Sequence, residues 1–305
     1  IPLLRKFVNE SRFVNGCKIS GLCSQNKKDA EEYGDLELIT DDFDKILEAS
    51  DALYIASHPT LHYKQIKKAL KNGKHVICES PVALSGEECD ELYEIAGKSG
   101  LILMDAIKTA YSTAYARMLL LIESGAIGKV VSVDATCTSL RVNENGDPDY
   151  YKTNWNSSCD WGPNAILPVF QLLGTKYKDI RIISSFADED KDYDLFSKFD
   201  FTYDSAVATV KVGKGVKSEG ELVVSGTKGY VYVPAPWWKT DYFEIRYENP
   251  ADKKRYFYQL NGEGIRYEIV AFIKAIESGR VIDMIPREVS RAICEVVSSK
   301  NRIEI

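Results

Sequence analysis

The sequence predicts an α/β protein in two parts: a doubly wound parallel sheet first, then an α+β part with a large, mostly antiparallel sheet. In the first third of the chain, four short apolar runs alternate with segments of helical periodicity, as in parallel sheets that are covered on both faces. After residue 107, strand-like runs follow one another with few helices between them, which favours antiparallel pairing. The predicted domains are therefore residues 1–107 and 108–305.

The elements of the first domain follow from apolar runs bounded by turn or capping residues. The last predicted helix begins with a capping box, Ser85-x-x-Glu88, and the helix before it ends at Asn72-Gly73. Strand, helix and strand at this spacing indicate right-handed crossovers and parallel pairing. The predicted strands are 18–23, 51–56, 75–79 and 101–106, and the predicted helices are 41–48, 61–72 and 87–98.

The first residues have a helical pattern of their own. Leu3, Leu4, Phe7 and Val8 share one helical face, and Asn15-Gly16 ends the segment. In a doubly wound sheet, a helix that leads into strand 18–23 follows a first strand and a phosphate-binding turn, and no GxGxxG occurs in the chain. We therefore expect the natural gene product to begin before Ile1; the alternative is a natural start there.

The second domain begins with a helix at 111–122 that Gly125 closes, and a strand at 131–138 with one buried and one polar face. Thr227-Lys228-Gly229 is interpreted as a hairpin turn, and the acidic run 188–194 as a solvated loop rather than a metal site. The other predicted strands are 180–187, 199–212, 221–225, 230–233, 242–247 and 255–260, and the closing helices are 265–276 and 289–297.

Composition excludes several classes of function. With 39 basic and 45 acidic residues the net charge is −6, which argues against a dedicated nucleic-acid-binding protein. No stretch approaches the roughly 18 apolar residues of a membrane span, and no signal peptide is visible. The seven cysteines fit neither a CxxC metal site nor a secreted disulfide framework. We expect a cytoplasmic, metal-free protein that binds neither nucleic acid nor membranes.

Six motifs spread along the chain carry a resemblance to a known family. They are Ala-Ser-His-Pro-Thr-Leu-His at 56–62, Gly-Lys-His-Val-Ile-Cys-Glu-Ser-Pro at 73–81, Leu-Met-Asp-Ala at 103–106, Leu-Ile-Glu-Ser-Gly-Ala-Ile-Gly at 121–128, Gly-Thr-Lys-Gly-Tyr at 226–230 and Gly-Glu-Gly-Ile-Arg-Tyr-Glu at 262–268. Together they resemble the Gfo/Idh/MocA family of NAD(P)-dependent oxidoreductases.

The resemblance implies an N-terminal Rossmann domain that binds NAD or NADP. It also implies a C-terminal domain whose open antiparallel sheet forms the interface of a homodimer or homotetramer. The implied reaction moves a hydride between the nicotinamide and a sugar, a polyol, or a related cyclic alcohol or carbonyl compound.

The chain departs from the family at positions expected near the nicotinamide. The family's Glu-Lys-Pro motif reads Glu79-Ser80-Pro81, so a serine replaces the lysine that contacts the reacting oxygen. Counting back from Leu172-Leu173-Gly174 aligns Asp160 with the family's aspartate and Asn164 with its histidine or tyrosine. The family's arginine after the sixth strand falls on Ala110.

Lys108 is the predicted substitute for the missing lysine. It follows the strand 101–106 by two residues, at the same sheet edge as Ser80, where ligands bind in parallel sheets. Partial burial there would lower the pKa of Lys108 and suit it to proton exchange with the substrate oxygen. The alternative is a solvated lysine in the first turn of the next helix. The predicted catalytic residues are Lys108, Ser80, Asp160 and Asn164.

The residues after strand 18–23 predict the preferred cofactor. Ser24, Gln25 and Asn26 stand there, and no carboxylate follows before Asp29, which favours the 2′-phosphate of NADP over the ribose hydroxyl of NAD. The other cofactor contacts that the resemblance implies are Ser57, Pro59, His62, Glu79, Ser80 and Pro81.

Two classes of function stay open. Losing the motif lysine together with the histidine favours a catalytically inactive dinucleotide-binding sensor or regulatory protein, whereas Asp160 and Lys108 favour an enzyme.

Four tryptophans are candidates for an apolar wall against a sugar ring, and at least two of them are expected to pack in the core: Trp155, Trp161, Trp237 and Trp238.

Overall fold

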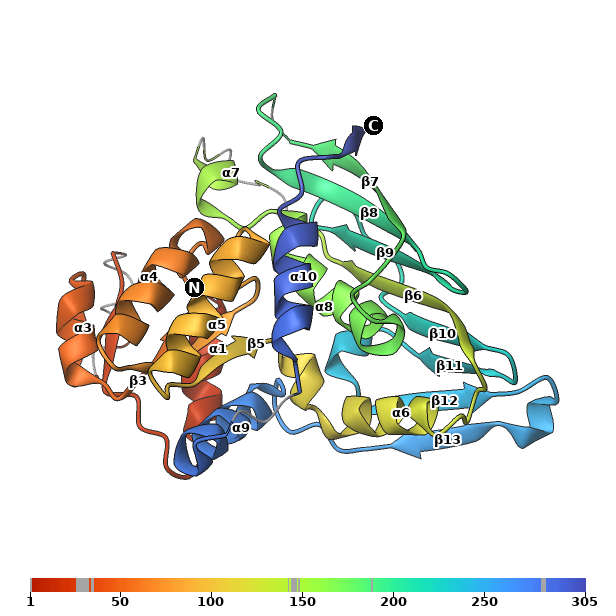
Figure 1. Ribbon diagram of the computed structural model, residues 1–305, viewed down its shortest axis with the longest axis horizontal. Coiled ribbons are helices and arrows are strands. Elements are labelled where there is room, and N and C mark those ends of the chain that lie inside the picture. Colours follow the sequence, from red (N-terminus) through yellow and green to blue (C-terminus); the bar gives the residue numbers. More distant parts are fainter. Residues whose placement is uncertain are drawn as a thin grey trace.

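The computed structural model describes residues 2–25, 33, 36–141, 143, 147, 149–187, 189–280 and 284–305. Figure 1 shows two parts, a compact α/β domain built from the first third of the chain and a broad open sheet built from the rest. The predicted fold class, a parallel domain followed by an antiparallel one, is confirmed. Three helices lie between the two parts or along the inner face of the large sheet: α6 Thr113–Glu123, α8 Ser157–Leu173 and α10 Arg287–Val297.

The first part is parallel throughout, but its strands form two separate sheets, β1-β2 and β3-β4-β5. Near-continuous burial of β4 and β5 explains their apolar sequences. Strand β2 was not predicted, because it has only three residues and none of them is fully buried. The strands are β1 Gly21–Cys23, β2 Leu38–Thr40, β3 Ala52–Ile55, β4 His75–Glu79 and β5 Leu103–Ala106.

The helices of this part begin and end close to the predicted residues. The Ser85 side chain accepts a hydrogen bond from the Glu88 N–H at 3.1 Å, which confirms the capping box at the start of α5. Asn72 closes α4, as predicted. The helices are α1 Pro2–Ser11, α3 Phe43–Ala49, α4 Pro59–Lys71 and α5 Gly86–Lys98.

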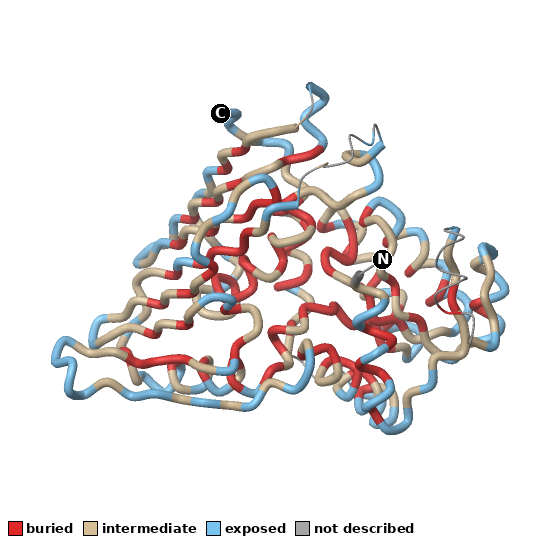
Figure 2. Tube along the Cα trace, turned by 180° about the vertical axis from the view of Figure 1, so that it is seen from behind, coloured by how far each residue is buried: buried red, intermediate tan, exposed pale blue. Residues whose placement is uncertain are grey.

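The second part is a nine-stranded sheet in the order β13-β12-β11-β10-β6-β9-β8-β7-β14. Its pairs are antiparallel except β6 with β9 and β7 with β14. Along its strands, buried residues alternate with more accessible ones, so one face is packed and the other is open (Figure 2). The strands are β6 Val130–Thr138, β7 Asp179–Phe186, β8 Asp194–Thr202, β9 Val207–Gly213, β10 Leu222–Gly226, β11 Tyr230–Val233, β12 Tyr242–Arg246, β13 Lys254–Phe257 and β14 Ile303–Glu304.

Two predictions about this part are wrong. The segment 199–212 is not one strand but parts of β8 and β9, because a tight turn, closed by Tyr203 N–H and the Ala206 carbonyl at 2.9 Å, reverses the chain. The acidic run does not stay in solvent to its end, since Asp194 begins β8 and is 1% exposed. The hairpin at 227–229 is confirmed between β10 and β11.

Helices from the second part of the sequence return to the first part in space. In α9, Phe272 and Ala275 pack against Ile77 and Ile102 of the parallel domain. Helix α10 lies beside α5 (Figure 1), and its Cys294 belongs to the core of the parallel domain. The boundary at residues 107 and 108 stays a prediction. The remaining helices are η1 Lys108–Tyr111, α6 Thr113–Glu123, α7 Tyr150–Thr153, α8 Ser157–Leu173, η2 Trp237–Lys239, η3 Pro250–Asp252, α9 Ile265–Ser278 and α10 Arg287–Val297.

Candidate active site

A cavity of about 440 Å³ lies between the two parallel sheets, where β1, β3 and α1 face one another. At the carboxyl ends of β1 and β3 its lining is polar, with Ser24, Gln25, Ser57 and Gln65. The Ser57 hydroxyl donates to Oε1 of Gln65 at 2.6 Å. Three of the predicted cofactor contacts therefore lie on one cavity, while Asn26 lies outside the described residues.

A second cavity of about 270 Å³ brings the four predicted catalytic residues together. Ser80 comes from the end of β4, Lys108 from η1, and Asp160 and Asn164 from α8. Ala56, directly after β3, lines both cavities. The two cavities therefore meet at the carboxyl edge of the parallel sheet, the edge at which such sheets bind ligands.

Lys108 points toward one side of this second cavity. Its Nζ lies 3.6 Å from Oε2 of Glu263, and 20% of its side chain is exposed. Burial lowers the pKa of Lys108, as predicted, and the Glu263 carboxylate opposes that effect. Glu263 also binds Lys239 at 2.8 Å and Lys6 at 3.2 Å. Although burial alone would raise it, these lysines hold the pKa of Glu263 at about 2.

The deep wall of the cavity is acidic. Glu79 ends β4, accepts a hydrogen bond from the Tyr54 hydroxyl, and has its pKa raised to about 7 by burial. Glu268, in the first turn of α9, is 1% exposed, and burial raises its pKa well above the usual range. Asp105 of β5 lies behind them; it is also 1% exposed, and burial raises its pKa to about 6. Two of the three acids with raised pKa values, Glu79 and Glu268, therefore line the second cavity itself.

The third wall belongs to α8. Asp160 and Asn164 lie on one face of that helix, as their spacing predicts. Oδ2 of Asp160 pairs with Lys214 at 3.0 Å and with Arg141 at 3.2 Å. Oδ1 of Asn164 accepts a hydrogen bond from the Thr109 hydroxyl at 3.1 Å, which leaves the amide nitrogen as a donor.

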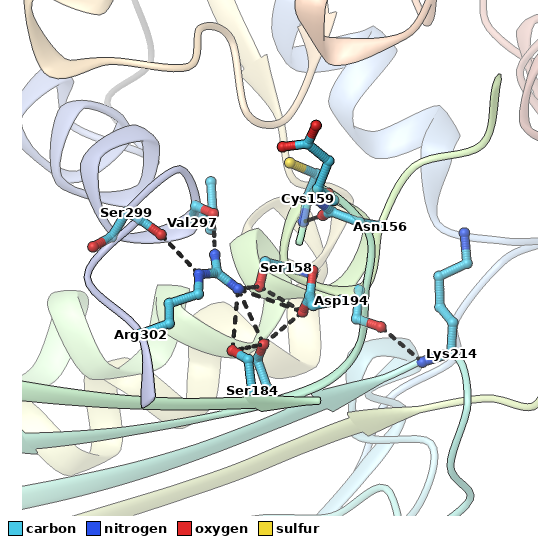
Figure 3. A network of polar contacts seen from close by, with 12 residues as sticks. Asn156, Ser158, Cys159, Ser184, Asp194, Lys214, Val297, Ser299 and Arg302 are labelled. Atoms are coloured by element: carbon cyan, nitrogen blue, oxygen red, sulfur yellow. Dashed lines mark hydrogen bonds and ion pairs between the residues drawn. The ribbon is translucent and has the colours of Figure 1, made fainter. Parts of the chain in front are cut away.

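A buried network around Ser158, Asp194 and Arg302 fixes the start of α8 (Figure 3), the helix that carries Asp160. The Asp194 carboxylate accepts from Ser158 N–H at 3.2 Å, the Ser158 hydroxyl at 2.8 Å and the Ser197 hydroxyl at 2.6 Å. Arg302, near the C-terminus, donates to Ser158 at 2.9 Å and to Ser197 at 3.1 Å (Figure 3). The last residues of the chain therefore anchor a helix that carries three residues of the cavity, Asp160, Trp161 and Asn164.

Three of the four tryptophans line the second cavity: Trp155, Trp161 and Trp238. Trp161 and Trp238 also pack against the core of the large sheet, with ring centres 4.8 Å apart. Trp237 is fully buried, and its indole N–H donates to the Thr136 carbonyl at 3.1 Å. Trp161 and Trp238 therefore both pack against the core and line the cavity.

His62, Pro59 and Pro81 are placed behind the cavities rather than on them, since none is among the described lining residues. The buried His62 ring lies between two carbonyl oxygens, with Nδ1 2.8 Å from that of Pro81 and Nε2 2.9 Å from that of Ser57. The ring therefore connects the loop after β3 to the loop after β4.

Sequence reasoning missed Glu263, Glu268, Lys214 and Arg141 as lining residues. A signal for Glu268 was present, because it falls on the same helical face as Ile265, Ile269 and Phe272. A carboxylate on a buried face is rare and marks either a paired or a functional group. Lys214 gave no such signal, since it lies in a polar loop after β9.

Within the described ranges, no group of three or more His, Cys, Asp or Glu side chains is arranged to hold a metal ion. In the same part of the chain, no helix is both long enough and apolar enough to cross a membrane.

The fold and the paired cavities define a class: two-domain proteins with a Rossmann domain joined to an open antiparallel sheet. The sequence family described as "Oxidoreductase family, NAD-binding Rossmann fold" matches residues 3–106. The match covers about a third of the chain and agrees with the resemblance of its motifs to the Gfo/Idh/MocA family.

Individual relatives agree with this assignment. Scyllo-inositol 2-dehydrogenase (NADP(+)) of Bacillus subtilis is 29% identical over 111 residues, which cover 35% of this chain and 34% of the relative. A dTDP-3,4-didehydro-2,6-dideoxy-alpha-D-glucose 3-reductase of Streptomyces violaceoruber is 33% identical over 98 residues, covering 32% and 29%. The matches thus span about a third of the length of these relatives.

Solved structures show the same fold along the whole chain. A 3-ketoreductase from Actinomadura kijaniata, in complex with NADP and TDP-benzene, superimposes with a TM-score of 0.84 at 19% identity. The match covers 99% of this chain and 95% of that one. A levoglucosan dehydrogenase, in complex with NADH and levoglucosan, gives a TM-score of 0.79 at 19% identity and covers 96% and 90%.

Proposed function

We propose that this protein is an NAD(P)-dependent dehydrogenase or reductase that acts on a sugar, a polyol or a related cyclic alcohol or carbonyl compound. One observation carries the proposal: Ser80, Lys108, Asp160 and Asn164 converge on a cavity that meets the Rossmann cavity at Ala56. A cofactor in the first cavity and a substrate in the second would then be in contact where their reacting atoms must approach to about 3–3.5 Å.

NADP is the preferred cofactor in this proposal, with NAD as the other. The polar edge of the first cavity suits a dinucleotide, and Ser24 and Gln25 would hold the 2′-phosphate there. NADP in the name of one relative and in one similar structure supports the choice. When bound, the cofactor supplies or accepts the hydride. The other proposed contacts are Asn26, Ser57, Pro59, His62, Glu79, Ser80 and Pro81.

In this proposal, each residue of the second cavity makes a different contact with the substrate. The Lys108 ammonium would stabilise negative charge on the reacting oxygen, and Ser80 and Asn164 would donate hydrogen bonds to substrate hydroxyls. Asp160, held by Lys214 and Arg141, would accept a hydrogen bond from a further hydroxyl. Trp155, with Trp161 and Trp238, would cover an apolar face of a ring.

The wider setting is part of the same proposal. We expect a cytoplasmic homodimer or homotetramer formed through the open face of the large sheet. All seven cysteines are free thiols, as is common in reducing compartments. Relatives named for inositol and for dTDP-sugar substrates support a carbohydrate-like small molecule.

The test begins with NADPH and NADH titrations followed by fluorescence, and continues with a screen of sugars, inositols and sugar nucleotides for absorbance change. We expect tighter binding of NADPH and turnover of at least one compound. Lys108→Met should lower kcat by about 100-fold or more while cofactor binding is retained. The exposed Lys129→Met is the matched control and should leave kcat unchanged.

Each result decides between the candidate functions. Tight NADPH binding without turnover of any compound would contradict the enzyme and favour the sensor. Absence of binding by both dinucleotides would contradict both. Gln25→Glu should shift preference from NADPH toward NADH, because a carboxylate repels the 2′-phosphate and accepts from the ribose hydroxyl. An unchanged preference would remove Gln25 from the cofactor site.

A further inference from the structure

Glu268 is the most conspicuous polar group that the proposed function leaves without a role. It comes from the first turn of α9, lines the second cavity and is 1% exposed. Its Oε2 atom is buried and has no hydrogen-bond partner among the described residues. A buried polar atom without a partner costs about 1–3 kcal/mol, so its retention calls for an explanation.

The charged groups around Glu268 do not offset the free-energy cost of burying its carboxyl group in the ionised form. Four neighbouring groups interact electrostatically with Glu268: Tyr54 from β3, Glu79 from β4, Asp105 from β5 and Lys108 from η1. Two of these are acids, and a like charge nearby disfavours the ionised form. The cation, Lys108, is 3.6 Å from Glu263 and not within 4.0 Å of Glu268. Burial and Glu79 both raise the pKa of Glu268, with Lys108 opposing them.

Glu263 and Glu268 both line the second cavity but differ in their partners. Lys108 is drawn toward Glu263, whose carboxylate favours the charged ammonium. Glu268 has no such partner and faces a cavity that Ser80 also lines. A neutral carboxylic acid in that position is both a hydrogen-bond donor and a transferable proton.

We propose that Glu268 contacts the reacting oxygen of the substrate and exchanges its proton, while Lys108 stays charged and stabilises that oxygen. This inference rests on the proposed function. In the reducing direction the carbonyl carbon gains a hydride and the carbonyl oxygen takes the proton of Glu268. The carboxyl O–H bond breaks, the alcohol O–H bond forms, and the carboxylate left behind is reprotonated from solvent. Oxidation of an alcohol follows the same steps in reverse.

The first test needs no substrate. Infrared difference spectroscopy of the cofactor-free protein, titrated between pH 5 and pH 9, detects protonated carboxyl groups by their C=O stretch. We expect carboxyl absorption at neutral pH, to which the partly protonated Glu79 also contributes, that decreases in Glu268→Gln and is unchanged in Glu277→Gln, an exposed glutamate on the same helix. Retention of the full band in Glu268→Gln would overturn the proposal. Thermal unfolding confirms that each variant is folded.

The second test uses the compound that the screen identifies. Glu268→Gln should lower kcat by about 100- to 10,000-fold and remove one limb of the pH–rate profile, with the NADPH dissociation constant unchanged. Glu268→Asp should recover part of the rate, because it keeps the transferable proton. If Glu268→Gln turns over within twofold of the original protein, Glu268 has only a structural role and the inference fails.

The two levels of proposal fail separately. Loss of NADPH binding in the unmodified protein contradicts the proposed oxidoreductase. Normal turnover in Glu268→Gln together with loss of turnover in Lys108→Met leaves the oxidoreductase intact and assigns the proton to Lys108 instead.

Discussion

Two acidic side chains with equal burial, one in β8 and one in α9, have opposite surroundings. Asp194 and Glu268 are each 1% exposed. Asp194 accepts three hydrogen bonds at 2.6–3.2 Å and lies 3.6 Å from the Arg302 guanidinium (Figure 3). Glu268 has one oxygen without a partner among the described residues and an acid, Glu79, close by.

The difference separates a structural group from a functional one. Removing a charge from water is costly, and partners must offset the cost if the group is to stabilise the fold. Asp194 has those partners and ties the C-terminal residues to α8. Glu268 lacks them, so it lowers stability and remains available to a ligand. Asp160 lies between these cases, paired with Lys214 and Arg141 yet still on the cavity.

The largest expected effect on stability comes from removing Arg302, the cation that is paired with Asp194. Arg302→Met leaves Asp194 buried without its guanidinium and should lower the free energy of unfolding by about 3–5 kcal/mol. Urea unfolding at neutral pH measures this loss. Lys191→Met is the control: it removes an exposed ion pair with Glu304, also in the C-terminal segment, and should cost less than about 1 kcal/mol. Equal losses in the two variants would erase the distinction drawn for Asp194.

A smaller effect is expected in the pH dependence of stability. The pKa of Glu79 is about 7 in the folded protein and 4.5 in the unfolded chain, so the folded state binds the proton more tightly. Its contribution to stability is fully present below pH 4.5 and is lost as the pH rises toward 7. The loss amounts to about 3 kcal/mol, and Glu79→Gln should remove it.

Urea unfolding at several pH values between 5 and 8 checks this slope. Carboxylates with a lowered pKa, such as Glu244 and Glu263, near 2, change stability only at lower pH and do not interfere. If the free energy of unfolding depends on pH in the same way in Glu79→Gln and in the original protein, ionisation of Glu79 does not destabilise the fold and the prediction is wrong.

The smallest effect on stability should follow from adding a lysine next to Glu79, among the acids of the second cavity that have raised pKa values. Ser80→Lys restores the lysine of the family motif beside Glu79, and an opposite charge at that distance lowers a carboxyl pKa by roughly 1–3 units. At pH 8 the variant should be more stable than Ser80→Met, its uncharged counterpart of similar size, by at least about 1 kcal/mol. Comparable stability of the two variants would mean that the acids of this wall lie beyond the reach of residue 80.

Much of the candidate site was predictable because it depends on local order along the chain. Apolar runs and capping residues located β3, β4, β5 and the helices between them, and parallel strands place their carboxyl ends at one edge. Ser80 and Lys108 follow such ends, so their convergence was expected and is observed. The turn at 203–206 escaped prediction, because the apolar alternation runs through it without a glycine or proline.

By itself, the sequence determined the parallel domain, the capped helices, the family motifs and the side chains that meet at the sheet edge. Only the tertiary structure decided which buried carboxylates are paired. The helical periodicity predicts that residue 268 faces inward. Whether a cation lies beside it depends on segments that are far away in the sequence. Glu268 has the acid Glu79 in its electrostatic surroundings, whereas Asp194 has the Arg302 guanidinium at 3.6 Å. The cost of a buried charge is set by that packing, because only neighbours in space can replace the water it has lost.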